Sequence, residues 1–481
     1  MSGRYSMITR RGFIASGSAI ALADSFDVFG KDGVAPNLRI GVLSDPHMKG
    51  EGTDGPLEKA LRIFDRMKVD AVACCGDLAT SGLVHELERV GAVWNRVFPN
   101  GRRSDGAPVA NLLIYGDHDM GGYAWIESKG LLPDDELKRL SIPNNDPAAL
   151  WERCFHEKWS PVVVKEVKGY HFILAHHPLH SKETCSGSFI PGVKEALQAY
   201  RSKLVGDKPF FYLQHRLLKG TVAGKIAWGQ DTGGITEMLK EFPNCFAMMG
   251  HGHVACTDER SIWQGEFTAL EVPSVRYCVP FTGCENSPSL PAGTPNEKER
   301  RKDMLMSPIL ARDARQGYVM DVYDRRIVIH RLDFVYSEGE RIAADWVVPL
   351  PLGRVSPYAY DVRAAKEIAP QFQEGAIVRS RRIKGSTRGK KPVECVEVTF
   401  PSACSNGDAP RANRYEVTAK CEDGRAVVRE VFSPKCYLHE DFDGGRVKCL
   451  FSVTELSGKI ENVHFSVRPV GAFGAKGKPI S

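Results

Sequence analysis

The chain has 481 residues, enough for two or three domains with a sizeable hydrophobic core. Its hydrophobic content of 42% and charged content of 26% are ordinary for a globular protein, and the formal net charge of +5 is too small to indicate nucleic-acid or membrane-surface binding. Thirteen cysteines without a Cys-x-x-Cys pair indicate neither a zinc ribbon nor a disulfide framework.

The first 23 residues are typical of a targeting segment. Arg10 and Arg11 precede a short, weakly apolar run, which resembles a twin-arginine export signal, and Ala21-Leu22-Ala23 offers a small-x-small cleavage site. The run is too short and too interrupted to span a bilayer, and no other segment is long and apolar enough to be transmembrane. We therefore expect residues 1–23 to direct export to a periplasmic or extracellular location; a disordered N-terminal tail is the alternative.

From Leu38 onward, the patterns of buried strands and amphipathic helices alternate. Strands are predicted at 38–43, 71–75, 112–115, 170–175, 210–215 and 245–249, and helices at 57–67, 85–98, 191–204 and 234–242. Short connections between these elements predict βα units with helices on both faces. Two antiparallel strands at 318–323 and 327–332 follow, and a proline-marked segment at 345–352 closes a first domain, which we place at 37–355.

Two stretches of this first domain lack a clear pattern. Residues 120–160 are rich in Pro and Asp, and we expect an irregular insertion or lid near the site. Residues 283–312 are rich in Pro, Glu and Lys, and we expect a long surface loop.

The C-terminal part, 365–481, has a different character. Short β-type runs separated by turn residues predict an all-β sandwich without a helix of any length. The predicted runs are 376–378, 395–400, 414–419, 426–432, 447–453 and 463–467. Residues 379–391 hold seven basic side chains, which indicate a solvated hairpin tip, with an anion-binding loop as the alternative.

Polar clusters follow five of the predicted strands of the first domain. The carboxyl ends of strands are where an open α/β sheet carries its chemistry, so we expect these clusters to meet at one site. They are Asp45-Pro46-His47, Gly76-Asp77, Gly116-Asp117-His118-Asp119, a histidine at 176 or 215, and His251-Gly252-His253.

Carboxylates and imidazoles without a thiolate suit two divalent cations such as Mn, Fe, Zn or Ni. A carboxylate shared between the two cations offsets their repulsion. Two cations about 3.5–4 Å apart can clamp a phosphoryl group and activate a bridging water. The residue types therefore favour a two-metal site acting on a phosphate ester.

The ordered motifs, over roughly residues 38–350, resemble those of the calcineurin-like metallophosphoesterase superfamily. The resemblance implies a four-layer α/β/β/α sandwich in the α/β class. It also implies that His118 faces the substrate phosphate, as an acid or a phosphate-stabilising group, and that Asp119 orients it. The implied metal ligands are Asp45, His47 and His253 for the first ion, Asp77 as the bridge, and Asp117, His215 and His251 for the second.

Two positions need separate comment. The superfamily has Asn where this chain has Asp117, and the added negative charge should reduce the Lewis acidity of the metal pair. His215 is favoured over His176 because its strand immediately precedes the strand that ends at His251. Four further histidines are expected around the site or at the surface, namely His85, His156, His177 and His180.

The resemblance implies an exported two-metal phosphoesterase that hydrolyses a phosphomonoester or phosphodiester by in-line attack of a metal-bridging hydroxide. A nucleotide or cyclic-nucleotide phosphodiesterase is one alternative. A non-catalytic metal-binding surface protein with a degenerate site is the other. The C-terminal part loosely resembles fibronectin type III-like modules. The expected partner is a phosphate-ester substrate.

Overall fold

The computed structural model of the chain describes residues 34–50, 52–178, 192–224, 229–278, 290–291, 305, 314–335, 339–387, 389–403, 411–434, 446–456 and 460–481. The predicted export signal, residues 1–23, lies outside the described residues. Among the described helices, none combines the length and apolar character needed to cross a bilayer.

The first six-stranded sheet has the order β13-β12-β11-β1-β2-β3. The strands β1, β2 and β3 run parallel, whereas β11, β12 and β13 are added antiparallel beside β1. The bounds are β1 Leu38–Leu43, β2 Ala71–Cys74, β3 Ala110–Leu113, β11 Gln316–Val322, β12 Arg326–Asp333 and β13 Trp346–Pro349.

The second six-stranded sheet has the order β4-β5-β6-β7-β9-β8. Its four central strands are parallel, and the edge strands β4 and β8 are antiparallel to their neighbours. The bounds are β4 Val162–Val167, β5 Tyr170–Ala175, β6 Phe210–Gln214, β7 Cys245–Met249, β8 Ile262–Gln264 and β9 Thr268–Glu271. The strands β4, β8 and β9 are additions to the predicted set.

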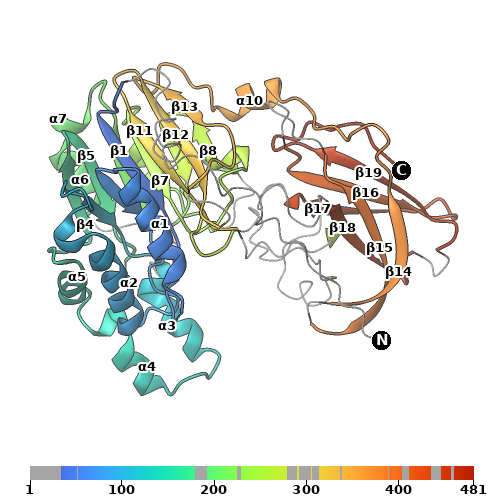
Figure 1. The fold of residues 1–481 in the computed structure, drawn as a ribbon, viewed down its shortest axis with the longest axis horizontal. Coiled ribbons are helices and arrows are strands. Elements are labelled where there is room, and N and C mark those ends of the chain that lie inside the picture. The colour runs from blue at the N-terminus through green and yellow to red at the C-terminus, as the bar shows by residue number, and fades with distance from the viewer. Residues whose placement is uncertain are drawn as a thin grey trace, which may run out of the picture. The chain divides into compact units, whose positions relative to one another are not determined.

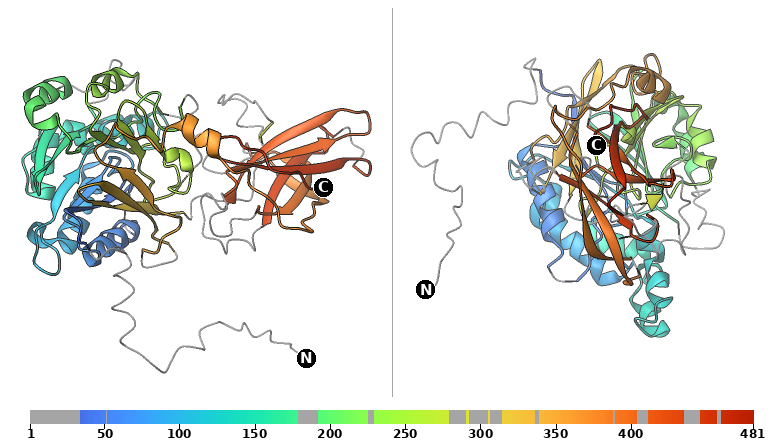
Figure 2. Two further views of the ribbon diagram at one scale, coloured as in Figure 1. Left: turned by 90° about the horizontal axis from the view of Figure 1, so that it is seen from above. Right: turned by 90° about the vertical axis from the view of Figure 1, so that its right-hand side faces the viewer.

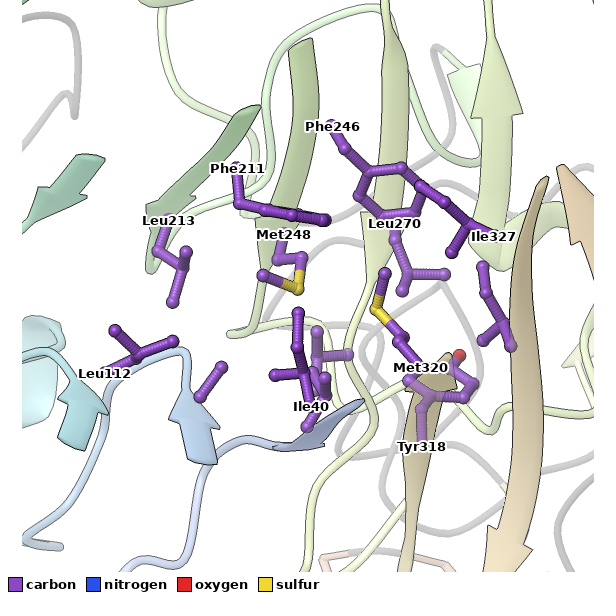
Figure 3. Close-up of a cluster of buried hydrophobic side chains, with 14 of the residues drawn as sticks. Ile40, Leu112, Phe211, Leu213, Phe246, Met248, Leu270, Tyr318, Met320 and Ile327 are labelled. Atoms are coloured by element: carbon purple, nitrogen blue, oxygen red, sulfur yellow. The ribbon is translucent and has the colours of Figure 1, made fainter. Parts of the chain in front are cut away.

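The two sheets pack face to face around one hydrophobic core (Figure 3). One sheet contributes Ile40, Leu112 and Met320, and the other contributes Phe211 and Met248, all fully buried. Inward-facing apolar side chains of two sheets interdigitate in this way in β-sandwich cores. Apolar side chains therefore fill the space between the two inner faces.

Helices cover the outer faces of the sheets (Figure 1, Figure 2). The helices α1, Gly55–Arg66, and α2, Val84–Val97, lie on the first sheet, where Leu61 and Trp94 line a small apolar space together with strand residues. The second sheet buries apolar side chains of α6, Val193–Ala199, α7, Arg201–Leu204, and α8, Gly234–Leu239. The predicted four-layer α/β/β/α sandwich is thereby confirmed.

The segment after β3 differs from the prediction, because residues 117–155 are largely helical. They form α3, Asp117–Glu127, α4, Asp134–Leu140, and α5, Pro147–Phe155. The α5 helix begins where the Asp146 carboxylate accepts hydrogen bonds from the backbone N–H groups of Ala148 and Ala149, at 3.1 and 3.2 Å. The expected irregular insertion is wrong here, and only part of the segment lacks regular structure.

The C-terminal part forms two small sheets, as predicted, with the orders β10-β17-β16-β19 and β14-β15-β18. Buried side chains of the two sheets share one core that includes Tyr415 and Phe451. A short helix, α10, precedes them at Tyr360–Lys366. The strand bounds are β10 Leu290–Pro291, β14 Arg379–Ser386, β15 Pro392–Pro401, β16 Arg414–Lys420, β17 Ala426–Phe432, β18 Arg446–Ser452 and β19 His464–Val470.

Three details of this part correct the predictions. Residues 376–378 are not a strand. The basic segment is not only a hairpin tip, because β14 occupies most of it as an exposed edge strand, in which Arg381 pairs with Glu397 at 2.7 Å. Of the expected surface loop 283–312, only 290–291 and 305 are described, and β10 pairs with β17. The domain boundaries at 37–355 and 365–481 stay a prediction.

A buried polar contact links the β7–β8 connection to the C-terminal sheets. The Asn413 amide donates to Asp258 at 3.0 Å and accepts from Arg260 at 3.3 Å, while Arg260 also donates to Asp258. All three side chains are buried. This network holds the segment around Asp258, which lies a few residues after His253 in the chain.

Candidate metal centre

The ends of β1, β2, β6 and β7 and the start of α3 bring together the seven residues predicted as metal ligands. They form two groups in which one ligand atom per residue lies within 4.8 Å of the others, and Asp77 belongs to both. The first group is Asp45, His47, Asp77 and His253, and the second is Asp77, Asp117, His215 and His251.

In the first group, three side chains converge on a common point. The His253 Nε2 atom lies 3.0 Å from Asp45 Oδ1 and 3.1 Å from His47 Nε2. His47 Nε2 is also 3.6 Å from Asp77 Oδ2. Asp45 is fixed from the other side, because its Oδ2 accepts a hydrogen bond from the His251 backbone N–H at 3.1 Å.

In the second group, the other oxygen of Asp77 takes part. His215 Nε2 lies 3.1 Å from Asp77 Oδ1 and 3.3 Å from Asp117 Oδ1. The His251 Nδ1 atom is 3.2 Å from His215 Nε2 and 3.4 Å from Asp117 Oδ2. Asp77 therefore presents one oxygen to each group, which is the arrangement that a bridging carboxylate needs.

The hydrogen bonds of the ligand side chains show that this group of residues suits divalent cations. His215 Nδ1 lies 2.7 Å from the Cys75 carbonyl oxygen, which can only accept, so the N–H is on Nδ1 and the Nε2 lone pair faces the carboxylates. Asp45 Oδ1 and Asp117 Oδ1 are buried and have no hydrogen-bond donor among the described residues. A buried, charged carboxylate oxygen without a hydrogen-bond donor destabilises the folded protein unless a cation neutralises it.

The backbone at the site is unusual. Five of the seven residues have positive φ angles between 44° and 67°, namely Asp45, His47, Asp77, His251 and His253. Non-glycine residues rarely adopt this region, and such conformations concentrate at functional sites. Gly116 makes room for the shared carboxylate, because a Cβ at this position would lie 2.2 Å from Asp77 Oδ1.

The electrostatics of His47 and Asp77 keep these two side chains in ligand-competent forms. Burial, with the neighbouring His118, lowers the pKa of His47 to about 3, so this imidazole is neutral near pH 7. Burial alone would raise the pKa of Asp77, but His215 and His118 outweigh it, and the net shift is downward. A neutral imidazole and a charged carboxylate are the forms that bind metal ions.

His118 lies beside the two groups, in the first turn of α3. Its ring meets His47 edge-on with the centroids 4.8 Å apart, and its Nδ1 donates to the Thr80 carbonyl oxygen at 2.5 Å. The Asp119 carboxylate does not orient this imidazole as predicted. It accepts instead from the backbone N–H groups of Leu78, Ala79 and Gly116, at 3.1, 2.7 and 2.6 Å.

Among the described residues, His85, His156, His176 and His177 belong to neither ligand group. His176 is buried, and its Nδ1 accepts from the backbone N–H of Tyr115 at 3.0 Å. His177 is buried with its ring centroid 6.4 Å from that of His215. His85 and His156 are exposed, and His180 lies outside the described residues.

Two side chains beside the site, Arg216 and Tyr277, were not predicted from the sequence. Arg216 binds Asp117 through its guanidinium, with Nη2 2.9 Å from Oδ2. The Tyr277 ring packs against His253, with the centroids 4.5 Å apart, and stacks near His47 at 6.0 Å. Arg216 directly follows the ligand His215 in the chain, but this position does not identify Asp117 as its partner. No sequence pattern marked Tyr277.

Comparisons with known proteins agree with this geometry. Residues 38–253 match the family model described as calcineurin-like phosphoesterase. No curated protein sequence matches the chain.

The solved structures that match the chain cover about two thirds of it at low identity. A dimetal phosphatase from Danio rerio aligns with 10% identity over 65% of this chain and 99% of its own, at a TM-score of 0.36. Purple acid phosphatase PPD1 from yellow lupin (Lupinus luteus) seeds aligns with 13% identity over 65% of this chain and 55% of its own, at 0.39. GAP50 of Plasmodium, the anchor in the inner membrane complex, aligns with 12% identity over 66% and 89%, at 0.36.

These scores are low, and the assignment rests on the family model, which spans the strands and turns that carry all seven ligands. Residues 38–253 of this chain therefore match the calcineurin-like phosphoesterase family, a family of phosphoester hydrolases.

Proposed function

We propose that the chain is a two-metal phosphoesterase that hydrolyses a phosphomonoester or phosphodiester. The observation that carries the proposal is the shared carboxylate of Asp77, which faces one ligand group with each oxygen. Asp45, His47 and His253 would hold the first cation, and Asp117, His215 and His251 the second. When bound, two such cations polarise the phosphoryl oxygens and lower the pKa of water.

His118 is the residue we assign to proton transfer or phosphate binding. Its Nδ1–H is committed to the Thr80 carbonyl oxygen, so the tautomer is fixed and Nε2 is the atom left for chemistry. Burial would lower the pKa of His118, but Asp77 and Asp117 outweigh it and the net shift is upward. A protonated Nε2 can donate to the leaving oxygen or to a phosphate oxygen.

Asp119 has a structural part in this proposal. By accepting from the backbone N–H groups of Leu78 and Ala79 and from that of Gly116, it holds the turn after Asp77 against the start of α3. Burial and the nearby Asp77 raise the pKa of Asp119 to about 8, whereas the three N–H groups act in the opposite direction. Asp119 thus supports the position of His118 through the backbone.

The test combines metal analysis with an activity panel on the full chain. Elemental analysis is run beside hydrolysis of simple aryl phosphomonoesters and phosphodiesters, for the parent and for His118→Ala. We expect two equivalents of transition metal in both proteins, turnover by the parent, and a loss of kcat of about 100-fold to 10,000-fold in the variant.

The panel also separates the alternatives. Preference for diesters, followed by activity on cyclic nucleotides, supports the phosphodiesterase alternative. One equivalent of metal or none, with no turnover after Mn, Fe or Zn is added back, would sink the enzyme proposal and support a non-catalytic metal-binding protein.

We further propose that the protein is exported through the twin-arginine type of signal at its N-terminus. The support is the sequence Arg10-Arg11 followed by the short apolar run and Ala21-Leu22-Ala23. Fractionation of cells expressing the parent and an Arg10→Lys/Arg11→Lys variant tests this. We expect the parent in the exported fraction and the variant retained; equal distribution of the two contradicts the proposal.

A further inference from the structure

The carboxylate of Asp117 is held on one side by a guanidinium. Arg216 Nε and Nη2 both donate to Asp117 Oδ2, at 3.1 and 2.9 Å. Only 23% of the Arg216 side chain and 13% of the Asp117 side chain are exposed, so water screens this pair weakly. Charge-assisted hydrogen bonds of this kind are among the stronger ones in proteins.

The second oxygen of Asp117 is directed to the ligand group. Its Oδ1 lies 3.3 Å from His215 Nε2 and has no hydrogen-bond donor among the described residues. The two oxygens therefore have different surroundings. Oδ2 accepts both guanidinium hydrogen bonds and lies 3.4 Å from His251 Nδ1, whereas Oδ1 faces His215 and is left for a cation.

The backbone of Arg216 is itself anchored. The buried Gln214 amide donates to the Arg216 carbonyl oxygen at 2.6 Å, and the Tyr212 hydroxyl donates to Gln214 Oε1 at 3.0 Å. Gln214 and Tyr212 are both at most 1% exposed. A buried polar network with satisfied partners fixes the position of the groups attached to it.

From these contacts we infer that Asp117 and Arg216 act together as one neutral, single-oxygen ligand for the second divalent cation. The guanidinium cancels the charge that Asp117 adds to the charge of Asp77, and it occupies the oxygen that would otherwise allow two-oxygen binding. Arg216 is a positioning residue in this account, because it acts on the cation through Asp117. The inference rests on the proposed two-metal function.

Asp117→Asn should weaken cation binding as long as Arg216 is present. With Arg216 in place, the guanidinium donors attract the amide oxygen of the new side chain and turn its NH₂ group toward the cation, while the charge of Arg216 is left unbalanced. Both effects weaken cation binding. Removing Arg216 as well frees the amide oxygen and removes the charge, so the double variant should recover.

The experiment measures Mn²⁺ binding to the demetallated full chain by titration calorimetry, giving a dissociation constant for each of two sites. We expect Asp117→Asn to raise the Mn²⁺ dissociation constant of the lower-affinity site at least tenfold. In Asp117→Asn/Arg216→Met, the same dissociation constant should lie within threefold of the parent value. Asp117→Asn/Arg216→Gln replaces the double variant if thermal unfolding shows that the Met form is not folded.

A matched control uses an arginine in an exposed ion pair. Asp117→Asn/Arg201→Met removes the partner of Glu241, and it should stay as weak as Asp117→Asn alone. The inference is overturned if Asp117→Asn binds Mn²⁺ as tightly as the parent, or if the Arg216 double variants are no tighter than Asp117→Asn. Failure of the parent to bind two Mn²⁺ ions would instead remove the proposed function.

Discussion

The two ligand groups of the candidate centre are built from the same residue types but balance their charges differently. In the first group, Asp45 faces the imidazole of His253 and a backbone N–H. In the second, Asp117 is held by the guanidinium of Arg216. The first group therefore keeps the full charge of its own carboxylate, whereas the second does not. Since a cation is attracted by net negative charge, we expect the first group to bind the tighter of the two ions.

The largest effect is expected from the residue that the two groups share. Asp77→Asn keeps the shape of the side chain but leaves a single neutral oxygen where two charged ones faced His47 and His215. We expect metal content to fall below one equivalent and kcat to fall on the order of 1,000-fold. Elemental analysis and hydrolysis of an aryl phosphate measure both.

The control for this change is Asp105→Asn, which alters an ion pair with Arg103 and a hydrogen bond from the Ala107 backbone N–H, and which is in neither ligand group. It should behave like the parent. Two tightly held metal ions in Asp77→Asn would show that this carboxylate does not bridge.

Removing one ligand from each group should separate the groups. His253→Gly affects only the first group and His215→Ala only the second. Each variant should lower the metal content from two equivalents to one. Loss of a residue that supports a ligand weakens metal binding up to about 100-fold, so loss of the ligand itself should weaken binding at the affected site by more than about 100-fold. Metal analysis after dialysis checks this, and loss of both ions from either variant would argue against two separable sites.

A steric change at Gly116 should disturb the shared carboxylate without removing any ligand. An added Cβ would lie 2.2 Å from both the backbone nitrogen and Oδ1 of Asp77. Overpacking of this kind costs about 1–3 kcal/mol of unfolding free energy. Denaturant unfolding of Gly116→Ala measures the cost.

The matched control is Gly55→Ala at the start of α1, where a Cβ would meet nothing within 4 Å. Its stability should change by less than about 0.5 kcal/mol. Equal stability of the two variants would mean that the turn around Gly116 relaxes freely.

The smallest effect is expected at a buried ion network in the first sheet. His330 Nε2 lies 3.3 Å from Asp321, and its Nδ1 lies 3.0 Å from Asp345. Burial lowers the pKa of His330, but the two carboxylates outweigh it and the net shift is upward. A raised pKa in the folded state stabilises the protein below the ordinary value of 6.5, and this contribution is lost as the pH rises through the folded pKa.

The parent should therefore lose stability as the pH rises above 6.5, and His330→Gln should abolish this loss. Urea unfolding of both proteins at pH 6 and pH 9 measures it. The same pH slope in parent and variant would contradict the assignment.

The strands were predictable because they are buried apolar runs. Residues 38–43, 170–175, 245–249 and 426–432 are strands with the bounds expected from the sequence. β4 was missed because its residues are mostly half-buried, which blurs the pattern. The α3 helix was missed because it starts within the polar cluster at Asp117 and contains two adjacent glycines, which carry low helix propensity.

The convergence of the seven predicted ligands followed from the rule that functional groups gather at the carboxyl ends of strands. The roles of Asp119 and Arg216 did not follow. Asp119 binds backbone groups some 40 residues earlier in the chain, and Arg216 binds a carboxylate 99 residues earlier. Contacts between distant residues depend on how the two sheets and the turn after β3 meet, and a single sequence carries no direct signal of them.

The left-handed backbone at five of the ligand residues has a practical consequence for mutagenesis. Alanine, the usual replacement, removes the ligand atom but also disfavours the conformation of the turn, so a loss of metal in such a variant has two causes. Glycine removes the ligand atom and accepts the conformation. At Asp45, His47, Asp77, His251 and His253, a glycine scan is therefore the cleaner way to measure what each side chain contributes.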